Sequence, residues 1–396
     1  MNLKDFTIVC KRILDDHFKR VEKEIAKGNI SYEGNKIDHV YYPTTMLCVE
    51  SDGEVFSVEL LGLTKVREPL KIKKRDNISI KELTLIDRKS NAKLPALNVG
   101  SRTIFSNVMF CDKESSDLHD SQGNPFSKTF TTGFIIGGQM THILALDSDS
   151  SSCLLSECML NYVNKNVYRS RYMHLLMAFN AKLNEHDIAS DINYFLNNSG
   201  PILGVHHFHS DEYLYWVKAS YLMNLVLNDK IHETTIGDYL NDHSDIILNA
   251  LGYRGIVYEP ILEWIEKTQD NPDSCINPDA LLQRVDGFYD ICDFKKGLTK
   301  TKSLTKDDRR RRRFIDHVNE GLAQLDNYEE YFTFELNKKH ALERYNVKVS
   351  SPSKILIIGN IANARQDEIE QSLRGRNNTL VVDYDSLISS YIGSIK

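Results

Sequence analysis

The strongest constraint on the fold of this chain is a hairpin signal in its C-terminal third. Asp286-Gly287 separates two short apolar runs, ALLQRV (280–285) and FYDICDF (288–294). An Asp-Gly pair between such runs is typical of a tight turn that joins two antiparallel strands. The sequence therefore predicts a β-hairpin over residues 280–294.

The length of the hairpin loop decides which side chains face each other. A two-residue loop sets Asp279 opposite Phe294, which puts Asp279 and Asp293 on different faces of the sheet. A three-residue loop over 285–287, with Gly287 in the left-handed conformation, sets Asp279 opposite Asp293 instead. Directly opposed Cβ atoms lie about 4.5–5.5 Å apart, a separation that suits two carboxylates sharing one cation.

Lys295 follows Asp293 by two residues, so on a strand both side chains project from one face. Two adjacent carboxylates repel each other unless a positive charge lies between them, and Mg²⁺ is the natural candidate. Lys295 is then placed to orient or deprotonate an attacking water, or to neutralise charge on a phosphate. The alternative is an ordinary solvated edge strand, because an isolated Asp-x-Lys is common.

The stretch RFIDHVNEGLAQLDNYEEYF (313–332) predicts a helix with two distinct faces. Its apolar stripe consists of Phe314, Val318, Leu322 and Leu325. A separate face carries His317, Glu320, Gln324 and Tyr328. Either this second face is solvated, or Gln324 and Tyr328 hold a water, a phosphate or the lysine of the neighbouring strand.

A strongly basic loop, KKGLTKTKSLTKDDRRRRR (295–313), is predicted between the hairpin and the helix. It holds five Lys and five Arg against two Asp, although the 396-residue chain has a net charge of −6. Most charge runs are solvated loops, but basic side chains also bind nucleic acid by neutralising phosphates. The candidate DNA-binding residues are Lys296, Lys300, Lys302, Arg309, Arg310, Arg311, Arg312 and Arg313. Because the run has no aromatic residue before Phe314, base stacking is not predicted.

The rest of the chain predicts a multidomain α+β protein. We expect a helix over 1–27, a β-rich domain over 1–150, a helical middle section over 151–250 and an α/β domain over 251–396. The β-rich part contains alternating stretches separated by turn residues, and its polar segment 111–128 predicts a loop.

Composition excludes several classes of protein. Seven Cys are scattered without a CxxC motif, which argues against a disulfide framework and against a structural zinc site. The charged N-terminus lacks the apolar core of a signal peptide, and no apolar run is long enough to span a bilayer. A soluble, cytoplasmic protein without a membrane partner is therefore expected. The glycines of GFIIGGQM (133–140) lack the spacing of a dinucleotide-binding loop.

The motif HHFH, with His206, His207 and His209, suggests a second kind of site. Adjacent histidines do not easily converge on one ion, and no acidic or Cys partner has suitable spacing in the sequence. We therefore interpret the motif as a polar approach to the following helix rather than as a metal site.

Residues 251–396 resemble the PD-(D/E)xK nuclease superfamily and, more narrowly, the Shedu anti-phage defence nucleases. Four stretches carry the resemblance in order: NPDALLQRVDGFYDICDFKK (277–296), AQLDNY (323–328), PSKILIIGN (352–360) and TLVVDYDSLISSY (379–391). They are similar, in turn, to the family's Pro-Asp hairpin with its acidic-x-Lys core, its Gln-Leu-x-x-Tyr helix, its late core strand and its closing strand.

This resemblance implies a restriction-endonuclease-like domain with a mixed central sheet, and a metal-dependent DNA endonuclease that acts in defence against phage. By the resemblance, Asp279 and Asp293 bind Mg²⁺, with Mn²⁺ as a substitute, Lys295 serves the water and the phosphate, and Gln324 completes the site. The implied partner is double-stranded DNA. The implied assembly is a homo-oligomer such as a tetramer, with a regulatory or DNA-recognition role for residues 1–150.

The sequence departs from the family pattern at several positions. Asp293 stands where Glu is commoner, Asp290 is a competing acid, and Gly297 stands where Pro is frequent. Many members also carry a Glu on the helix before the first strand, and Glu259, Glu263 and Glu266 all remain open for that role. The alternative function is a catalytically inactive protein that binds DNA ends, or senses them, on a nuclease scaffold.

Overall fold

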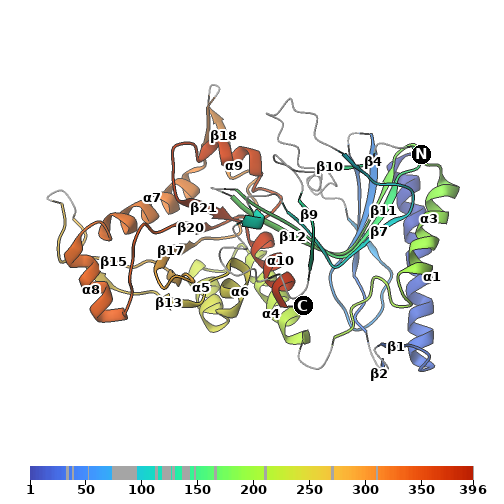
Figure 1. Cartoon of the computed structure of the whole chain (residues 1–396), viewed down its shortest axis with the longest axis horizontal. Coiled ribbons are helices and arrows are strands. Elements are labelled where there is room, and N and C mark those ends of the chain that lie inside the picture. Colours follow the sequence, from blue (N-terminus) through green and yellow to red (C-terminus); the bar gives the residue numbers. More distant parts are fainter. Residues whose placement is uncertain are drawn as a thin grey trace. The chain divides into compact units, whose positions relative to one another are not determined.

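The computed structural model of the chain forms two compact units of mixed α and β structure (Figure 1). The N-terminal unit comprises residues 1–113, 130–160 and 172–213, and the C-terminal unit comprises residues 114–129, 161–171 and 214–396. The structure describes residues 1–32, 35–37, 40–51, 53–73, 96–111, 115–117, 126, 130–135, 143–146, 149–164, 167–208, 212–268, 272–308 and 311–395. The expected loop at 111–128 lies largely outside this description.

The N-terminal unit is β-rich, and two helices cover one face of its sheet. Its helices are α1 (Leu3–Ala26) and α3 (Glu185–Asn198). Its strands are β1 (Ser31–Tyr32), β2 (Asn35–Lys36), β3 (Thr45–Ser51), β4 (Val55–Leu61), β5 (Lys71–Lys73), β6 (Ala96–Asn98), β7 (Thr103–Ser106), β8 (Val108–Cys111), β9 (Thr131–Ile135), β10 (Ile143–Ala145) and most of β11 (Ser152–Asn164) and β12 (Val167–Asn180). Strand β4 pairs antiparallel with both β3 and β12.

The helical expectation for 151–250 is wrong over residues 152–180, which form β11 and β12. The reason is burial on both faces of the sheet. Leu175 and Met177 of β12 face the core that includes α1 and α3, whereas Leu176 and Ala178 face a second core. Over Leu175–Phe179 such a strand is continuously apolar, and its pattern there cannot be told from that of a buried helix.

The C-terminal unit has a mixed sheet between two layers of helices. The sheet order is β13 (Gly255–Tyr258), β16 (Ala280–Gln283), β17 (Tyr289–Phe294), β20 (Lys354–Ile357), β21 (Thr379–Val382) and the first residues of β12. The first three strands pair antiparallel, and β17, β20, β21 and β12 run parallel. Two small hairpins lie outside this sheet: β14 (Leu262–Glu263) with β15 (Cys275–Ile276), and β18 (Thr305–Asp308) with β19 (Arg311–Phe314).

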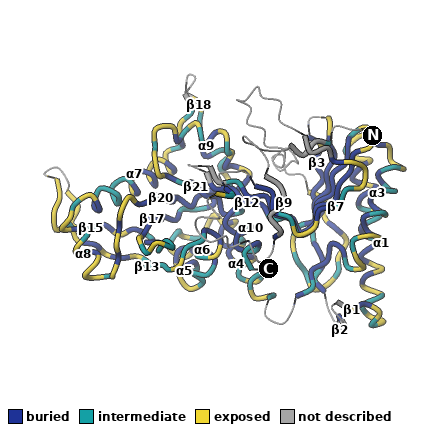
Figure 2. The backbone as a smooth tube through the Cα atoms, in the orientation of Figure 1, coloured by how far each residue is buried: buried dark blue, intermediate teal, exposed yellow. Residues whose placement is uncertain are grey.

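The helices of this unit divide between the two faces of the sheet. One core contains side chains of α4 (Glu212–Val226), α5 (Glu233–Asp242), α6 (Asp245–Leu251) and α10 (Tyr384–Ile395). The other contains side chains of α7 (Asp316–Tyr331), α8 (Glu335–Tyr345) and α9 (Gln366–Ser372). Every residue of β17 and β20 is buried between these layers, while α8 carries exposed turns (Figure 2).

Several predicted elements are confirmed. A helix occupies Leu3–Ala26 of the expected 1–27. The helix predicted over 313–332 begins only at Asp316, because residues 311–314 form β19. The predicted stripe is nevertheless buried in the core, with Phe314 on β19 and Val318, Leu322 and Leu325 on α7. None of the helices in the described ranges is both long and apolar enough to cross a membrane.

A candidate metal-binding and catalytic site

The hairpin of β16 and β17 has the three-residue loop that sets Asp279 opposite Asp293. Ala280 pairs with Cys292, and the backbone N–H of Arg284 donates to the Phe288 carbonyl oxygen at 2.8 Å. Gly287 has a φ of 87°, the left-handed conformation that glycine adopts without strain. Continued by one residue, the register brings Asp279 and Asp293 together, as the longer loop predicts.

The three charged side chains converge on one face of the sheet. Lys295 Nζ lies 2.9 Å from Asp293 Oδ2, which confirms that both project from the same face of the strand. Asp279 Oδ2 accepts a hydrogen bond of 2.6 Å from the backbone N–H of Phe294. The Asp293 side chain is only 2% exposed, so this charge cluster is largely shielded from water.

Burial sets the proton affinity of the two carboxyl groups. It raises the pKa of Asp293 to about 7, and the charge of Asp279 adds to the effect while Lys295 opposes it. Burial also raises the pKa of Asp279, partly offset by the hydrogen bond from Phe294 and by Lys295. Burial lowers the pKa of Lys295, but the nearby carboxylates outweigh burial and hold it above its usual value. Two acids therefore share a single ammonium group.

This donor set fits a divalent cation. Asp293 Oδ2 is buried and receives no well-directed hydrogen bond, although it forms the ion pair with Lys295. Paired carboxylates are the hard oxygen ligands that Mg²⁺ and Mn²⁺ prefer. Two ionised acids beside one ammonium also leave one negative charge for a cation to neutralise.

A third carboxylate, Glu233, was not singled out from the sequence. It opens α5, and its Oε2 lies 3.8 Å from Lys295 Nζ. Of the three glutamates considered for this role, Glu263 has its carboxylate paired with Arg344. The other two are placed by backbone contacts: the Glu266 N–H donates to Asn337 Oδ1, and the Glu259 N–H donates to the Asp279 carbonyl oxygen. The only sequence signal for Glu233 is an acidic residue in the first turn of a helix.

Helix α7 approaches the Asp293 carboxylate closely at Gly321, which has no side chain. A Cβ added to Gly321 would lie 3.5 Å from Asp293 Oδ2 and 3.4 Å from Lys295 Cε. Gln324 lies one helical turn after Gly321 on the same face of α7, and it is exposed. Tyr328 lies one turn further along, and its hydroxyl donates to the Asn277 carbonyl oxygen at 3.2 Å. Gln324 thus lies beside the site, and its role in the site remains a prediction.

The competing acid and the unusual glycine both have structural reasons. Asp290 accepts hydrogen bonds from the Tyr253 hydroxyl and the Ser353 backbone N–H, and it pairs with Arg284, so it is bound elsewhere. Burial raises its pKa. At Gly297, an added Cβ would lie 2.7 Å from the Val226 carbonyl oxygen, so no larger residue fits without a shift of the backbone.

The basic run is not the loop expected over 295–313, because residues 305–308 and 311–314 form the β18–β19 hairpin. Alternation along β19 separates its side chains. Arg312 pairs with Glu368 of α9 at 2.7 Å and with Asp307 at 3.0 Å, so it anchors the hairpin. Arg313 lies on the opposite face of the strand and is exposed.

The other candidate DNA-binding residues differ in their surroundings. Lys300 pairs with Asp229 at 3.0 Å, Lys302 is exposed, and Lys296 is half-buried. Arg311 is described only by its backbone position in β19, and Arg309 and Arg310 lie outside the described residues. The hairpin therefore presents a basic face that consists of Arg313 and its cross-strand partner Lys306, which also pairs with Asp316 at 2.8 Å.

Comparison with known proteins gives no match: no protein-family model fits the sequence, and no curated protein is significantly similar to it.

Proposed function

We propose that the C-terminal unit is a metal-dependent DNA endonuclease of the PD-(D/E)xK type, similar to the Shedu nucleases that act in defence against phage. One observation carries the proposal. Asp279, just before β16, lies opposite Asp293 of β17, and Lys295 Nζ lies 2.9 Å from Asp293 Oδ2 in a nearly buried cluster. A surplus of buried acidic charge is costly in a purely structural role and useful in a cation site.

Asp279 and Asp293 are the residues that would hold Mg²⁺, with Mn²⁺ as a substitute. A bound divalent cation would lower the pKa of a water and neutralise charge on the scissile phosphate. Lys295 carries a fixed positive charge at the same place, since its pKa stays above the usual value despite burial, a shift caused by the adjacent carboxylates. It would position the phosphate and the attacking water.

The surroundings of Lys295 would keep its ammonium group in place. The Tyr384 hydroxyl donates to the Lys295 carbonyl oxygen at 2.7 Å, which fixes the backbone, and Asp293 and Glu233 flank the ammonium group. Gln324, exposed on α7 between Gly321 and Tyr328, would contact the water or the phosphate. The basic face of the β18–β19 hairpin would bind the DNA backbone.

The proposal also includes a homo-oligomer, such as a tetramer, and a regulatory or DNA-recognition role for the N-terminal unit. These two elements depend on the family resemblance alone.

The experiment that tests the proposal compares cleavage by the full-length protein and its lysine variants. Linear, circular and single-stranded DNA are incubated with Mg²⁺, Mn²⁺ or EDTA. Lys295→Met is expected to lose at least about 100-fold in rate, the usual contribution of a group that assists proton transfer or positioning. Lys339→Met, which changes an exposed lysine of α8, is expected to cleave like the natural protein.

Lys295→Arg keeps the positive charge between the carboxylates but replaces the ammonium group. It therefore serves as a control for the folding of the lysine variants. Full cleavage by folded Lys295→Met would contradict the catalytic role. DNA binding without products under any condition would support instead the inactive DNA-binding scaffold.

A further inference from the structure

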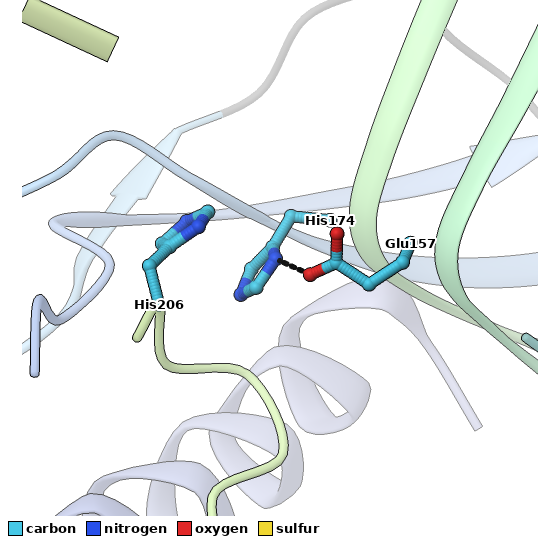
Figure 3. Close-up of side chains that lie close together, drawn as sticks. All are labelled: Glu157, His174 and His206. Carbon is cyan, nitrogen blue, oxygen red and sulfur yellow. Dashed lines mark hydrogen bonds and ion pairs between the residues drawn. The ribbon is translucent and has the colours of Figure 1, made fainter. Parts of the chain in front are cut away.

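Three residues far apart in the sequence meet inside the N-terminal unit (Figure 3). Glu157 lies on β11, His174 on β12, and His206 in the segment after α3. One potential ligand atom from each lies within 4.8 Å of those of the other two. Close in the sequence, His206 has no acidic or Cys residue that could share a metal ion with it. The fold supplies His174 and Glu157, which lie 32 and 49 residues earlier in the sequence.

The cluster is buried and one of its nitrogen atoms has no partner. His174 is 8% exposed and His206 is 5% exposed. His174 Nδ1 forms a 2.5 Å hydrogen bond with Glu157 Oε1, and the Tyr172 hydroxyl donates to the other oxygen of Glu157. His174 Nε2 is buried without a hydrogen-bond partner. A buried polar atom in that state points to an ion or a water that completes the site.

The contact between His174 and Glu157 resembles that of a metal ligand with its supporting carboxylate. A histidine that binds a metal through one ring nitrogen commonly donates its other N–H to a carboxylate, which fixes the ring. Burial lowers the pKa of His206 well below its usual value, and His174 adds to the effect.

One rearrangement is required for both rings to bind a single ion. The rings of His174 and His206 are stacked, with centroids 3.5 Å apart and planes 17° from parallel. The lone pair of an imidazole nitrogen lies in the ring plane, so two stacked rings cannot both direct a lone pair at one ion. His206 must therefore turn about its side-chain bonds, while two backbone hydrogen bonds to Tyr41, of 2.8 and 2.9 Å, hold its main chain.

We propose that His174 and His206 bind Zn²⁺ or a closely related divalent transition metal, with Glu157 as the carboxylate that orients the His174 ring. Imidazole nitrogens suit such ions, whereas Mg²⁺ and Ca²⁺ prefer oxygen ligands alone. The ion would link β12 to the segment that pairs with Tyr41. This proposal is independent of the proposed nuclease activity, because no residue of the Asp279–Asp293 cluster contributes to it.

The test uses metal-free full-length protein in which Asp279→Asn and Asp293→Asn remove the other cation site. Zn²⁺ is titrated against a chromophoric chelator. We expect one Zn²⁺ per chain, bound at least about 100-fold more weakly after His174→Gln or His206→Gln. His186→Gln, which changes a histidine with a 92% exposed side chain on α3, is the matched control and should bind unchanged. Unchanged affinity in folded His174→Gln and His206→Gln would overturn the proposal.

X-ray absorption at the zinc edge provides a second measurement, which needs no histidine variant to fold. In the zinc-loaded protein we expect nitrogen and oxygen neighbours at about 2.0–2.1 Å, with the scattering pattern of two imidazoles. Sulfur neighbours at about 2.3 Å would assign the ion to cysteine thiolates and overturn the proposal. Failure of the protein to bind Zn²⁺ at micromolar concentration would also overturn it.

Discussion

At the scale of single residues, the cluster of Asp279, Asp293 and Lys295 combines high burial with unequal charge. An isolated buried carboxylate costs several kcal/mol, and one ammonium group compensates only part of the cost of two. The raised pKa of Asp293, about 7 through burial and the charge of Asp279, expresses that cost. A folded chain accepts such a cluster where it serves a function, and cation binding is the function its geometry favours.

This charge imbalance predicts how stability depends on pH in the metal-free protein. An unfolded Asp has a pKa near 3.9, and the folded chain raises the pKa of Asp293 to about 7 by burial. The folded state then binds the proton more tightly, so its contribution to stability is complete below about pH 4 and is lost as the pH rises to about 7. Asp293→Asn removes this dependence. We expect it to raise the melting temperature most at pH 8, and by a progressively smaller amount as the pH falls toward 5.

The size of this effect follows from the shift in pKa. The rise in the pKa of Asp293, from about 3.9 in the unfolded chain to about 7 in the folded chain, corresponds to a difference on the order of a few kcal/mol in the free energy of unfolding. Thermal unfolding in EDTA across pH 5 to 8 measures it. If the stability of the natural protein changes with pH in the same way as that of Asp293→Asn, then Asp293 is ionised in the folded state throughout this range, which contradicts the prediction.

At the scale of secondary-structure elements, the β18–β19 hairpin separates an anchoring face from an exposed basic face. Arg312 bonds to Glu368 and Asp307, so Arg312→Ala should lower stability by about 1–3 kcal/mol, because Glu368 loses a charged partner. Arg313→Ala should leave stability unchanged and weaken DNA binding. The slope of the logarithm of DNA affinity against the logarithm of salt concentration should decrease by about the contribution of one phosphate contact.

Urea unfolding and DNA-binding titrations at several salt concentrations distinguish the two roles of these arginines. Lys339→Ala on α8 controls for the loss of one surface charge. Equal effects of Arg312→Ala and Arg313→Ala on both stability and affinity would contradict the division of the hairpin into two faces.

The elements also show what the sequence could predict. The Asp-Gly turn correctly predicted the hairpin, because turn chemistry is a local property, but it left two registers open. The structure has the three-residue loop, which sets Asp279 opposite Asp293. Strands β11 and β12 were predicted as helical, because burial on both faces removed their alternation. Glu233 and the His174–His206 pair were missed, since tertiary packing alone brings them to their partners.

At the scale of the whole molecule, the C-terminal unit is larger than the expected 251–396 domain. One of its cores depends on apolar side chains from before residue 252: Ala219, Leu222, Leu225, Val226, Ile236, Leu240, Ile246, Ile247, Ala250 and Leu251. The Tyr168 hydroxyl donates to the Ala250 carbonyl oxygen at 2.7 Å and also bonds to Ser390. The unit therefore needs α4, α5, α6 and the start of β12.

A fragment of residues 251–396 is consequently expected not to fold by itself. Each apolar side chain it lacks contributes about 1.5–3 kcal/mol when fully buried, and together they exceed the usual net stability of a domain, about 5–15 kcal/mol. Circular dichroism during thermal unfolding should show no cooperative transition for this fragment, in contrast to the full chain. A soluble 251–396 fragment with a sharp transition would contradict the assignment of α4, α5 and α6 to this unit.

The most direct test of the central claim is the location of Mn²⁺ by anomalous diffraction in crystals of the full-length protein. We predict a peak between Asp279 and Asp293, about 2.1 Å from a carboxylate oxygen of each, with Lys295 beside it. This peak should disappear in Asp279→Asn. A crystal grown in millimolar Mn²⁺ that shows no ion at these two carboxylates would contradict the claim that they form a cation site.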